Sequence, residues 1–491
     1  MALYLVWFAL HPDYHKFRLQ ELESLAECFG VDKSQLWPRE LPGYASPGAP
    51  EYERPLADDH SNSFAWVYLP DEAVALGILE RSILVRGFMQ VWSSAADHQG
   101  AQRILRENER VRTEFLQRYI HDHVDFSWRV RSIGKKLSRP EQIARMNEYG
   151  FLFKGTEVVN LSRPSLPLGI FEDWISLGTG GEHPKVGVSK EETSKAESSL
   201  KRVYVGRIVA IQGCTEVGDQ PIWWLKYSLN RRPILGPTTM DNELAFIMCN
   251  IAQVKRNDLV FDPFCGTGGI LISASHLGAT CFGSDLDLRV INGWFCSYVN
   301  PQMIQDKTIQ EDHPRSIYSN FDYYQLKRPG IVRMDISRHS IRSSWIDAIV
   351  CDPPYGIRAT SRTTNSNPSQ TKDSFANPTG KPGHYLGCGV SPPATAQTGS
   401  ARNHFGALQP VDDMIAELLT FASKTLVKNG HLVFLLPLVA SEYSQVISNL
   451  VQTWQHIFSI DLPYMQTLGG GLGRLLVHMQ LVNKDQAPSD S

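Results

Sequence analysis

The fold of this 491-residue chain is decided by the stretch Phe261-Asp262-Pro263-Phe264-Cys265-Gly266-Thr267-Gly268-Gly269-Ile270-Leu271-Ile272. An apolar strand ends in an acid, a glycine-rich turn follows, and a helix over residues 268–277 begins. Glycines let the backbone adopt positive φ and approach a ligand closely, and the free N–H groups of a helix N-terminus attract a carboxylate. Such a strand–turn–helix indicates a ligand site, although nucleotide-binding folds of many kinds contain one.

Acidic residues recur at the ends of the next predicted strands. Asp285 lies 23 residues after Asp262 and ends a strand over residues 279–284. A carboxylate at this place can accept hydrogen bonds from both ribose hydroxyls of a nucleotide, and Asp287 is a neighbour that could replace it. Asp335 ends a third strand and could reach an adenine amine. Each acid alone could be a helix cap, but the series in this order favours a cofactor pocket.

A second stretch, Asp352-Pro353-Pro354-Tyr355, follows a buried strand over residues 346–351. It matches the (D/N)PP(Y/F) signature of methyltransferases that act on exocyclic or amide nitrogens. The Asp352 carboxylate and the Pro353 carbonyl can accept the N–H hydrogens of an amine, which orients its lone pair and favours positive charge on the nitrogen. Consecutive prolines stiffen the loop, and Tyr355 offers a ring for stacking on a base. The alternative is a merely structural Pro-Pro turn.

Together the two stretches describe a class I methyltransferase that uses S-adenosyl-L-methionine. The sulfonium is a good leaving group, so the chemistry needs neither a metal nor a covalent nucleophile. Thr239 precedes an apolar helix, where it either belongs to a helix cap or lies over the methionine end of the cofactor. Cysteine-based methylation of a pyrimidine carbon remains an alternative. However, neither Cys265 nor Cys351 follows a proline as such nucleophiles do, and we interpret both as packing residues.

The order of the predicted elements separates two kinds of domain. From residue 259 strands and helices alternate, which is typical of βαβ units and a mainly parallel sheet; the strands are 259–262, 279–284, 346–351 and 431–436, and the helices are 268–277, 287–299 and 411–427. Residues 455–462 and 474–482 read as an antiparallel hairpin turning at Gly469-Gly470-Gly471. The N-terminal part mixes strands 3–9, 64–70 and 125–130 with helices 15–28, 101–120 and 140–149, as in a small α+β unit.

These patterns divide the chain as follows. We expect an N-terminal α+β region over 1–177, a linker over 178–202, a Rossmann-like α/β methyltransferase domain over 203–484 with a polar insert at 361–405, and a tail over 485–491. No apolar run approaches the roughly 20 residues that span a bilayer. No two of the eight cysteines lie within four residues of each other, so we expect reduced thiols of an intracellular protein and no metal site.

The balance of 48 basic and 51 acidic residues argues on average against a nucleic-acid partner. The charge is unevenly spread, however, because residues 100–139 hold ten basic and five acidic residues, a local charge of +5. A basic stretch there follows Phe126 and Trp128, and such a stretch can track phosphates. We assign RNA binding to its members Arg129, Arg131, Lys135, Lys136 and Arg139. The helix over residues 101–120 fits a solvated face equally well.

Five runs of sequence resemble one family closely. They are residues 4–27, 227–245, 261–279, 283–287 and 347–358. They resemble the catalytic subunit of the eukaryotic tRNA guanosine-10 N2-methyltransferase, a family that joins ferredoxin-like and THUMP RNA-binding portions to a class I methyltransferase domain. The resemblance implies N2-methylguanosine in tRNA as product, a heterodimer with a small zinc-binding activator subunit, and a cytoplasmic location.

The motifs carry the family's site onto this chain. They assign catalysis to Asp352, Pro353, Pro354 and Tyr355, and cofactor binding to Asp262, Pro263, Gly266, Thr267, Gly268, Asp285, Asp335 and Thr239. Three rivals remain: a DNA adenine-N6 methyltransferase, a protein-glutamine methyltransferase, and a catalytically silent RNA-binding scaffold. The N-terminal α+β unit disfavours the first, and the two intact motifs argue against the last.

Overall fold

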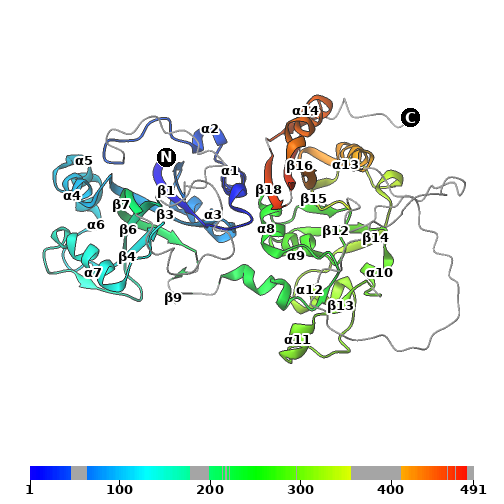
Figure 1. The fold of residues 1–491 in the computed structure, drawn as a ribbon, viewed down its shortest axis with the longest axis horizontal. Helices are drawn as coiled ribbons and strands as arrows, with labels where there is room; N and C mark the ends of the chain where they lie inside the picture. The colour runs from blue at the N-terminus through cyan, green and yellow to red at the C-terminus, as the bar shows by residue number, and fades with distance from the viewer. Residues whose placement is uncertain are drawn as a thin grey trace, which may run out of the picture.

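The computed structural model describes residues 1–45, 63–176, 198–212, 214–215, 218–219, 222–294, 296–354, 411–461, 463–469 and 471–483. Within these ranges the chain forms two lobes, each built around one large sheet (Figure 1). The predicted insert over 361–405 and the predicted tail over 485–491 lie outside the described residues.

The N-terminal lobe is an α+β unit, as predicted, with strands in the order β2-β1-β3-β7-β6-β4-β5. Its strands are β1 (Ala2–Phe8), β2 (Phe64–Leu69), β3 (Val85–Ala95), β4 (Asp125–Ile133), β5 (Val158–Val159), β6 (Leu166–Ser176) and β7 (Ser198–Ile211). Its main helices are α1 (Arg18–Cys28), α3 (Glu72–Arg81), α4 (His98–Glu107) and α7 (Arg139–Glu148). The apolar side chains Tyr4, Val6 and Phe8 alternate along β1 and pack in one cluster with α1 and α3.

The boundary between the two lobes differs from our expectation. Strand β7 pairs with β3 on one side and β6 on the other, in the middle of the N-terminal sheet. The residues 198–202 of the expected linker are therefore strand, and the boundary lies beyond Ile211 rather than at residue 203. The remainder of that linker, over 178–197, lies outside the described residues. The misplacement has a simple cause, because β7 is held by pairing with β3 and β6, and such pairing leaves no signal within the residues of β7 themselves.

The C-terminal lobe contains the Rossmann-like sheet, in the order β14-β12-β11-β15-β16-β19-β17. Its strands are β11 (Leu259–Asp262), β12 (Thr280–Asp285), β14 (Gly330–Arg333), β15 (Ile346–Cys351), β16 (Leu426–Val439), β17 (Phe458–Ile460), β18 (Tyr464–Gly469) and β19 (Leu472–Leu481). Its main helices are α8 (Asn242–Ile251), α9 (Gly269–His276), α12 (Ile317–Tyr323), α13 (Val411–Thr425) and α14 (Tyr443–Trp454). The first five strands in the order are parallel, and β19 runs antiparallel to β16. This confirms the predicted mainly parallel sheet with an antiparallel C-terminal hairpin.

Helices cover both faces of this sheet. Val260 and Val350 belong to the cluster that includes α8 and α9, whereas their neighbours Phe261 and Ile349 belong to the cluster that includes α13. The alternation follows from the two-residue period of a strand, and burial on both faces explains why these strands are apolar throughout.

Two predicted elements of this lobe are wrong in extent. The helix expected over 287–299 ends early, as α10 (Leu288–Ile291), because Gly293 adopts a φ of 69° and a Cβ there would lie 2.2 Å from the carbonyl oxygen of Arg315. The predicted hairpin is also wrong in its first strand. The strand that forms a hairpin with β19 is β18, and not residues 455–462. Strand β17 pairs with the other end of β19.

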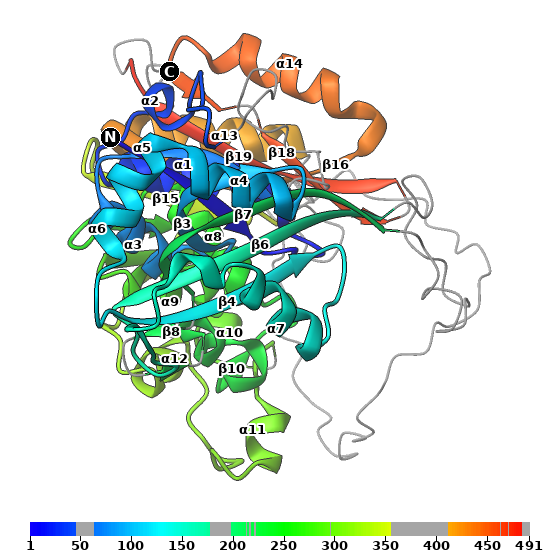
Figure 2. The same ribbon diagram turned by 90° about the vertical axis from the view of Figure 1, so that its left-hand side faces the viewer.

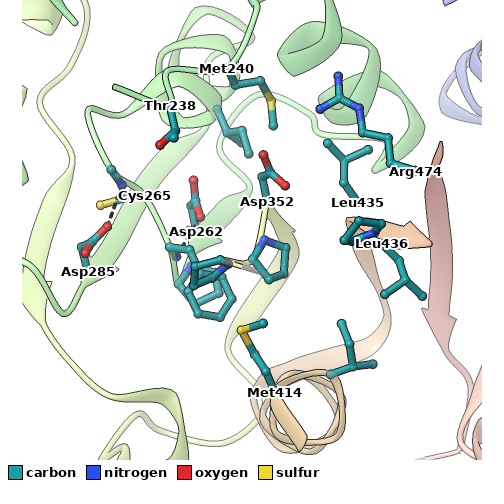
Figure 3. A pocket seen from close by; sticks show the side chains of 18 of the residues that line it. Thr238, Met240, Asp262, Cys265, Asp285, Asp352, Met414, Leu435, Leu436 and Arg474 are labelled. Atoms are coloured by element: carbon teal, nitrogen blue, oxygen red, sulfur yellow. Dashed lines mark hydrogen bonds between the residues drawn. The ribbon is translucent and has the colours of Figure 1, made fainter. Parts of the chain in front are cut away.

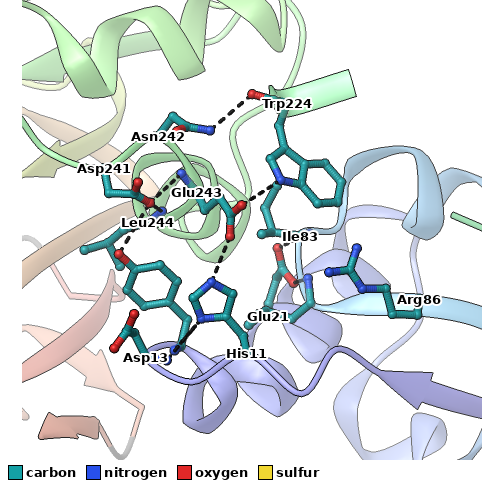
Figure 4. Close-up of polar contacts among 12 residues, drawn as sticks. His11, Asp13, Glu21, Ile83, Arg86, Trp224, Asp241, Asn242, Glu243 and Leu244 are labelled. Carbon is teal, nitrogen blue, oxygen red and sulfur yellow. Dashed lines mark hydrogen bonds and ion pairs between the residues drawn. The ribbon is translucent and has the colours of Figure 1, made fainter. Parts of the chain in front are cut away.

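The lobes meet through a polar and partly buried contact (Figure 4). His11 Nε2 lies 3.0 Å from the Glu243 carboxylate at the start of α8, and Trp224 donates to the same carboxylate at 3.1 Å. Glu21 of α1 is fully buried and accepts a hydrogen bond from Asn250 of α8. The view along the long axis shows the N-terminal lobe stacked on the C-terminal lobe (Figure 2). These contacts hold the two sheets together.

Candidate active site

A cleft of about 1770 Å³ opens at the carboxyl edge of the parallel strands of the C-terminal lobe. Strands β11, β12 and β15 are neighbours and run in the same direction, so their C-terminal residues gather at one edge. This brings together Asp262, Asp285 and Asp352 (Figure 3), and Asp335 also lines the cleft.

The glycine-rich turn forms the floor of one half of the cleft. Gly266 and Gly268 both have positive φ, at 50° and 83°, and Gly268 caps the N-terminus of α9. A Cβ added at Gly266 would meet no atom within 4 Å, so this backbone is open to a ligand. Thr267 is buried beside them, and Pro263 lines the same cleft.

Backbone donors hold the two acids next to this turn. Asp285 accepts hydrogen bonds from the N–H groups of Gly266 at 3.0 Å and Asp287 at 2.8 Å. Asp262 is buried and accepts one from the N–H of Phe264 at 3.0 Å. Burial raises the pKa of both carboxyls, and for Asp262 the nearby Asp285 and Asp352 add to the effect. Carboxylates of like charge in one cleft favour a cationic ligand.

Thr239 and Asp335 also line the cleft, and both side chains form hydrogen bonds with residues of their own loops. The Thr239 hydroxyl bonds to both backbone groups of Gly236 and lies 3.3 Å from the hydroxyl of Thr267. Asp335 accepts from the N–H and hydroxyl of Ser337. Asp287, the possible substitute for Asp285, is paired with Arg289.

Asp352, Pro353 and Pro354 form the neighbouring stretch of the cleft wall, because β15 lies directly beside β11. Burial raises the pKa of Asp352 to about 6, against the lowering effect of the Arg474 cation. Tyr355, the fourth residue of the motif, lies outside the described residues. The apolar side chains Met414, Leu435 and Leu436 lie around Asp352 (Figure 3).

Arg474 is a charged cleft residue that sequence reasoning missed. It comes from β19, far along the chain from both motifs, and no local pattern marks it. An adjacent-strand register between residues 434–437 and 474–477 would have been needed to place it, and pairing of distant strands is not visible in a single sequence.

The residues assigned to RNA lie on the other lobe. Arg129 and Arg131 are on β4, and Arg139 begins α7, at the end of the molecule away from the C-terminal lobe (Figures 1 and 2). Arg131, Lys136 and Arg139 are exposed, and the ammonium of Lys135 lies 4.3 Å from the ring centre of Trp174. The structure therefore places the basic stretch on the N-terminal lobe, and none of its five residues lines the cleft.

Other chemistries find little support in the described ranges. Cys265 and Cys351 are buried, and burial raises the pKa of both thiols well above the usual range, which makes them poor nucleophiles. The described residues contain no group of three or more His, Cys, Asp or Glu that could hold a metal ion. No helix among them is long and apolar enough to cross a bilayer.

Two family models match this chain. One, described as an RMKL-like methyltransferase domain, matches residues 230–370, and the other, described as the Tmrp11 THUMP N-terminal domain, matches residues 56–188. The second ends before β7, whereas the first contains both motifs of the cleft.

Curated relatives match over most of the chain. The human protein named tRNA (guanine(10)-N(2))-methyltransferase TRMT11 is 27% identical over 478 residues, which are 96% of this chain and 87% of that protein. The Saccharomyces cerevisiae protein named tRNA (guanine(10)-N(2))-methyltransferase is 26% identical over 430 residues, 86% of this chain and 81% of its own. Among solved structures, TrmN from Thermus thermophilus aligns with 98% of this chain and 100% of its own at 14% identity and a TM-score of 0.34.

Proposed function

Because this chain is a homologue of the tRNA (guanine(10)-N(2))-methyltransferases, we propose that it transfers a methyl group from S-adenosyl-L-methionine to the exocyclic N2 of guanosine-10 in tRNA, giving N2-methylguanosine. One observation carries the proposal. The glycine-rich turn after β11 and the Asp352-Pro353-Pro354 wall after β15 line one cleft from neighbouring parallel strands. A methyl donor and an acceptor amine are thereby held side by side.

The cleft fits S-adenosyl-L-methionine. Its acids suit a ligand that carries a sulfonium and an ammonium, and the bare backbone at Gly266 allows close approach. Asp285 would accept hydrogen bonds from the ribose hydroxyls, Asp335 would bind the adenine end, and Asp262, Thr239 and the turn would hold the methionine end. When bound, the cofactor supplies an electrophilic methyl group whose departure leaves a neutral thioether.

Asp352 and Pro353 act on the acceptor. The lone pair of the guanine amine is delocalised into the ring, so the amine is a poor nucleophile. The Asp352 carboxylate and the Pro353 carbonyl each accept a hydrogen bond from one N–H of this amine. The two hydrogen bonds turn its lone pair towards the methyl group. The N–C bond forms as the S–C bond breaks, the electron pair stays on sulfur, and the proton that N2 then loses passes to Asp352 or to water. Pro354 stiffens this wall, and Tyr355 stacks on the base.

The N-terminal lobe supplies the grip on tRNA. Arg129, Arg131, Lys135, Lys136 and Arg139 bind phosphates, and the contacts of His11 and Glu21 hold this lobe at a set orientation to the cleft. From the resemblance we also propose a cytoplasmic enzyme that pairs with a small zinc-binding activator subunit. Purification of the tagged protein from its own cells, with mass spectrometry and zinc analysis of what remains bound, tests that pairing.

Nucleoside mass spectrometry of tRNA tests the reaction. tRNA from cells that lack this protein should have lost N2-methylguanosine at position 10, and the purified enzyme with the donor should restore it. A transcript with adenosine at position 10 is the matched control and should remain unmodified. Intact N2-methylguanosine in the deleted cells, or methyl transfer to DNA or to a glutamine peptide instead, would refute the proposal.

A further inference from the structure

Arg474 and Asp352 lie at the same edge of the sheet and both line the cleft. Strand β15 lies beside β16 with Cys351 opposite Phe434, and β19 lies on the other side of β16 with Arg474 opposite Pro437. Asp352 and Arg474 therefore emerge at the same edge of the sheet, with one strand between them. Both line the cleft, and the close-up places Arg474 on one side of the Asp352 carboxylate and Asp262 on the other (Figure 3).

The guanidinium is held in place from one side. Its Nε donates to Gln466 Oε1 at 2.6 Å, and Gln466 lies directly opposite it on β18 and is only 5% exposed. Among the residues that the structure describes, no carboxylate forms an ion pair with Arg474. The two Nη groups are therefore the donors that remain for a ligand. The field of this cation reaches the site, since it lowers the pKa of Asp352 against the effect of burial.

The cleft thus presents acceptors and a fork of donors to the same ligand. Guanine carries hydrogen-bond donors at N1 and N2 and an acceptor at O6, whereas adenine carries an amine at the position of O6. The acceptors of Asp352 and Pro353 suit the N1 and N2 donors of guanine, and the guanidinium of Arg474 suits its O6 acceptor. With adenine, two sets of donors would face each other, and unpaired donors oppose binding.

We propose that Arg474 is a specificity-determining residue that donates a hydrogen bond to O6 of the target guanine and so selects guanine over adenine. The inference rests on the proposed function, because it assumes a guanine whose N2 lies at Asp352.

A double-mutant cycle, in which one change is made in the enzyme and one in the substrate, tests the contact between Arg474 and O6. We compare the enzyme, purified with any subunit that remains bound, with its Arg474→Met variant. Each acts on tRNA carrying guanosine or 2-aminopurine riboside at position 10. The analogue keeps the N2 amine and lacks O6. It also lacks the N1 hydrogen, but that loss is common to both enzymes and cancels in the cycle.

With guanosine, Arg474→Met should lower kcat/KM by roughly ten- to a hundredfold, the discrimination of a good contact to a base edge. The wild-type enzyme should lose a similar factor with the analogue, and the variant should lose little more. The combined loss should therefore be at least about fivefold smaller than the product of the single losses. Losses that simply multiply would overturn the proposal.

Three further measurements separate the explanations. Arg338→Met changes an exposed arginine outside the cleft and should stay within about twofold of wild type. Arg474→Lys keeps the charge without the fork, so it serves if the methionine variant does not fold, and it should also show reduced coupling to O6. If Arg474 acts only by keeping Asp352 ionised, raising the pH will restore the methionine variant fully, and the proposal fails. A wild-type enzyme inactive on guanosine-10 refutes the proposed function itself, whereas an active enzyme with multiplying losses refutes only the role of Arg474.

Discussion

Replacing Glu21 by alanine should destabilise the protein strongly, because this carboxylate joins the two lobes from a fully buried position. It accepts four hydrogen bonds, from the Ser82 hydroxyl at 2.7 Å, the N–H groups of Ile83 and Leu84 at 2.9 Å, and the Asn250 amide at 2.8 Å. The first three donors lie in the three residues just before β3, and the fourth belongs to α8 of the other lobe. The side chain thus organises a turn and a domain contact at once.

The size of the effect depends on which donors find another partner. The Leu84 N–H retains the Ser82 hydroxyl at 3.2 Å, and that hydroxyl also keeps its bond from the Val85 N–H at 2.8 Å. The Asn250 amide retains the carbonyl oxygen of Arg81 at 3.0 Å. The Ile83 N–H keeps no other acceptor among the described residues. An orphaned buried donor costs about 1–3 kcal/mol, and each weakened contact to a charged group adds about 0.5–1 kcal/mol. We expect Glu21→Ala to lower the free energy of unfolding by about 3–5 kcal/mol.

Urea unfolding followed by tryptophan fluorescence and circular dichroism measures the change. Glu21→Gln keeps the volume but turns an N–H₂ group towards N–H donors, so it should recover only part of the loss. Glu80→Ala, at an exposed position of α3, is the control and should stay within about 0.5 kcal/mol of wild type. A loss below about 1 kcal/mol for Glu21→Ala would refute the reasoning that these contacts stabilise the lobe interface.

Three further changes test the assigned roles. Asp352→Asn should lower kcat by about 10²–10⁴-fold in methyl-transfer assays. The wild-type rate should rise with pH through about 6, because the ionised form of Asp352 stabilises the positive charge that develops on the amine. Asp285→Ala should weaken cofactor binding at least about tenfold in calorimetry, since two ribose hydrogen bonds are lost. Arg129→Ala with Lys135→Ala should weaken tRNA binding and reduce the slope of log K against log salt by about 1.5–2, as for two lost phosphate contacts.

Each of these has its own control. Asp352→Asn should bind the cofactor as wild type does, and near-normal turnover would contradict the mechanism. Asp285→Ala should leave tRNA binding unchanged; unchanged cofactor binding would place the ribose elsewhere. For the basic pair, alanine at Lys255 and Lys428, exposed near the opposite edge of the C-terminal sheet, removes the same charge. An equal loss in both pairs would mean that the RNA surface is not specific to the N-terminal lobe.

Much of the cleft was predictable because its motifs are local. The strand before Asp262, the turn with Gly266 and Gly268, and the prolines after Asp352 each depend on residues that are close in sequence. Their glycines and prolines leave few backbone choices. The alternation of strands and helices then implies a parallel sheet, and a parallel sheet gathers such motifs at one edge. The average charge of −3 is misleading about nucleic-acid binding, because ten basic residues cluster within residues 100–139.

The sequence by itself thus determined the class of chemistry, the cofactor-type turn and the division into an α+β part and a Rossmann-like part. Only the tertiary structure decided which strands are neighbours. It placed β7 in the N-terminal sheet, brought Arg474 and Asp352 into one cleft, and buried Glu21 against Asn250 of the other lobe. The physical reason is the same in each case. Strand pairing and lobe packing depend on contacts between residues far apart in the chain, which leave no periodicity in the sequence around any one of them.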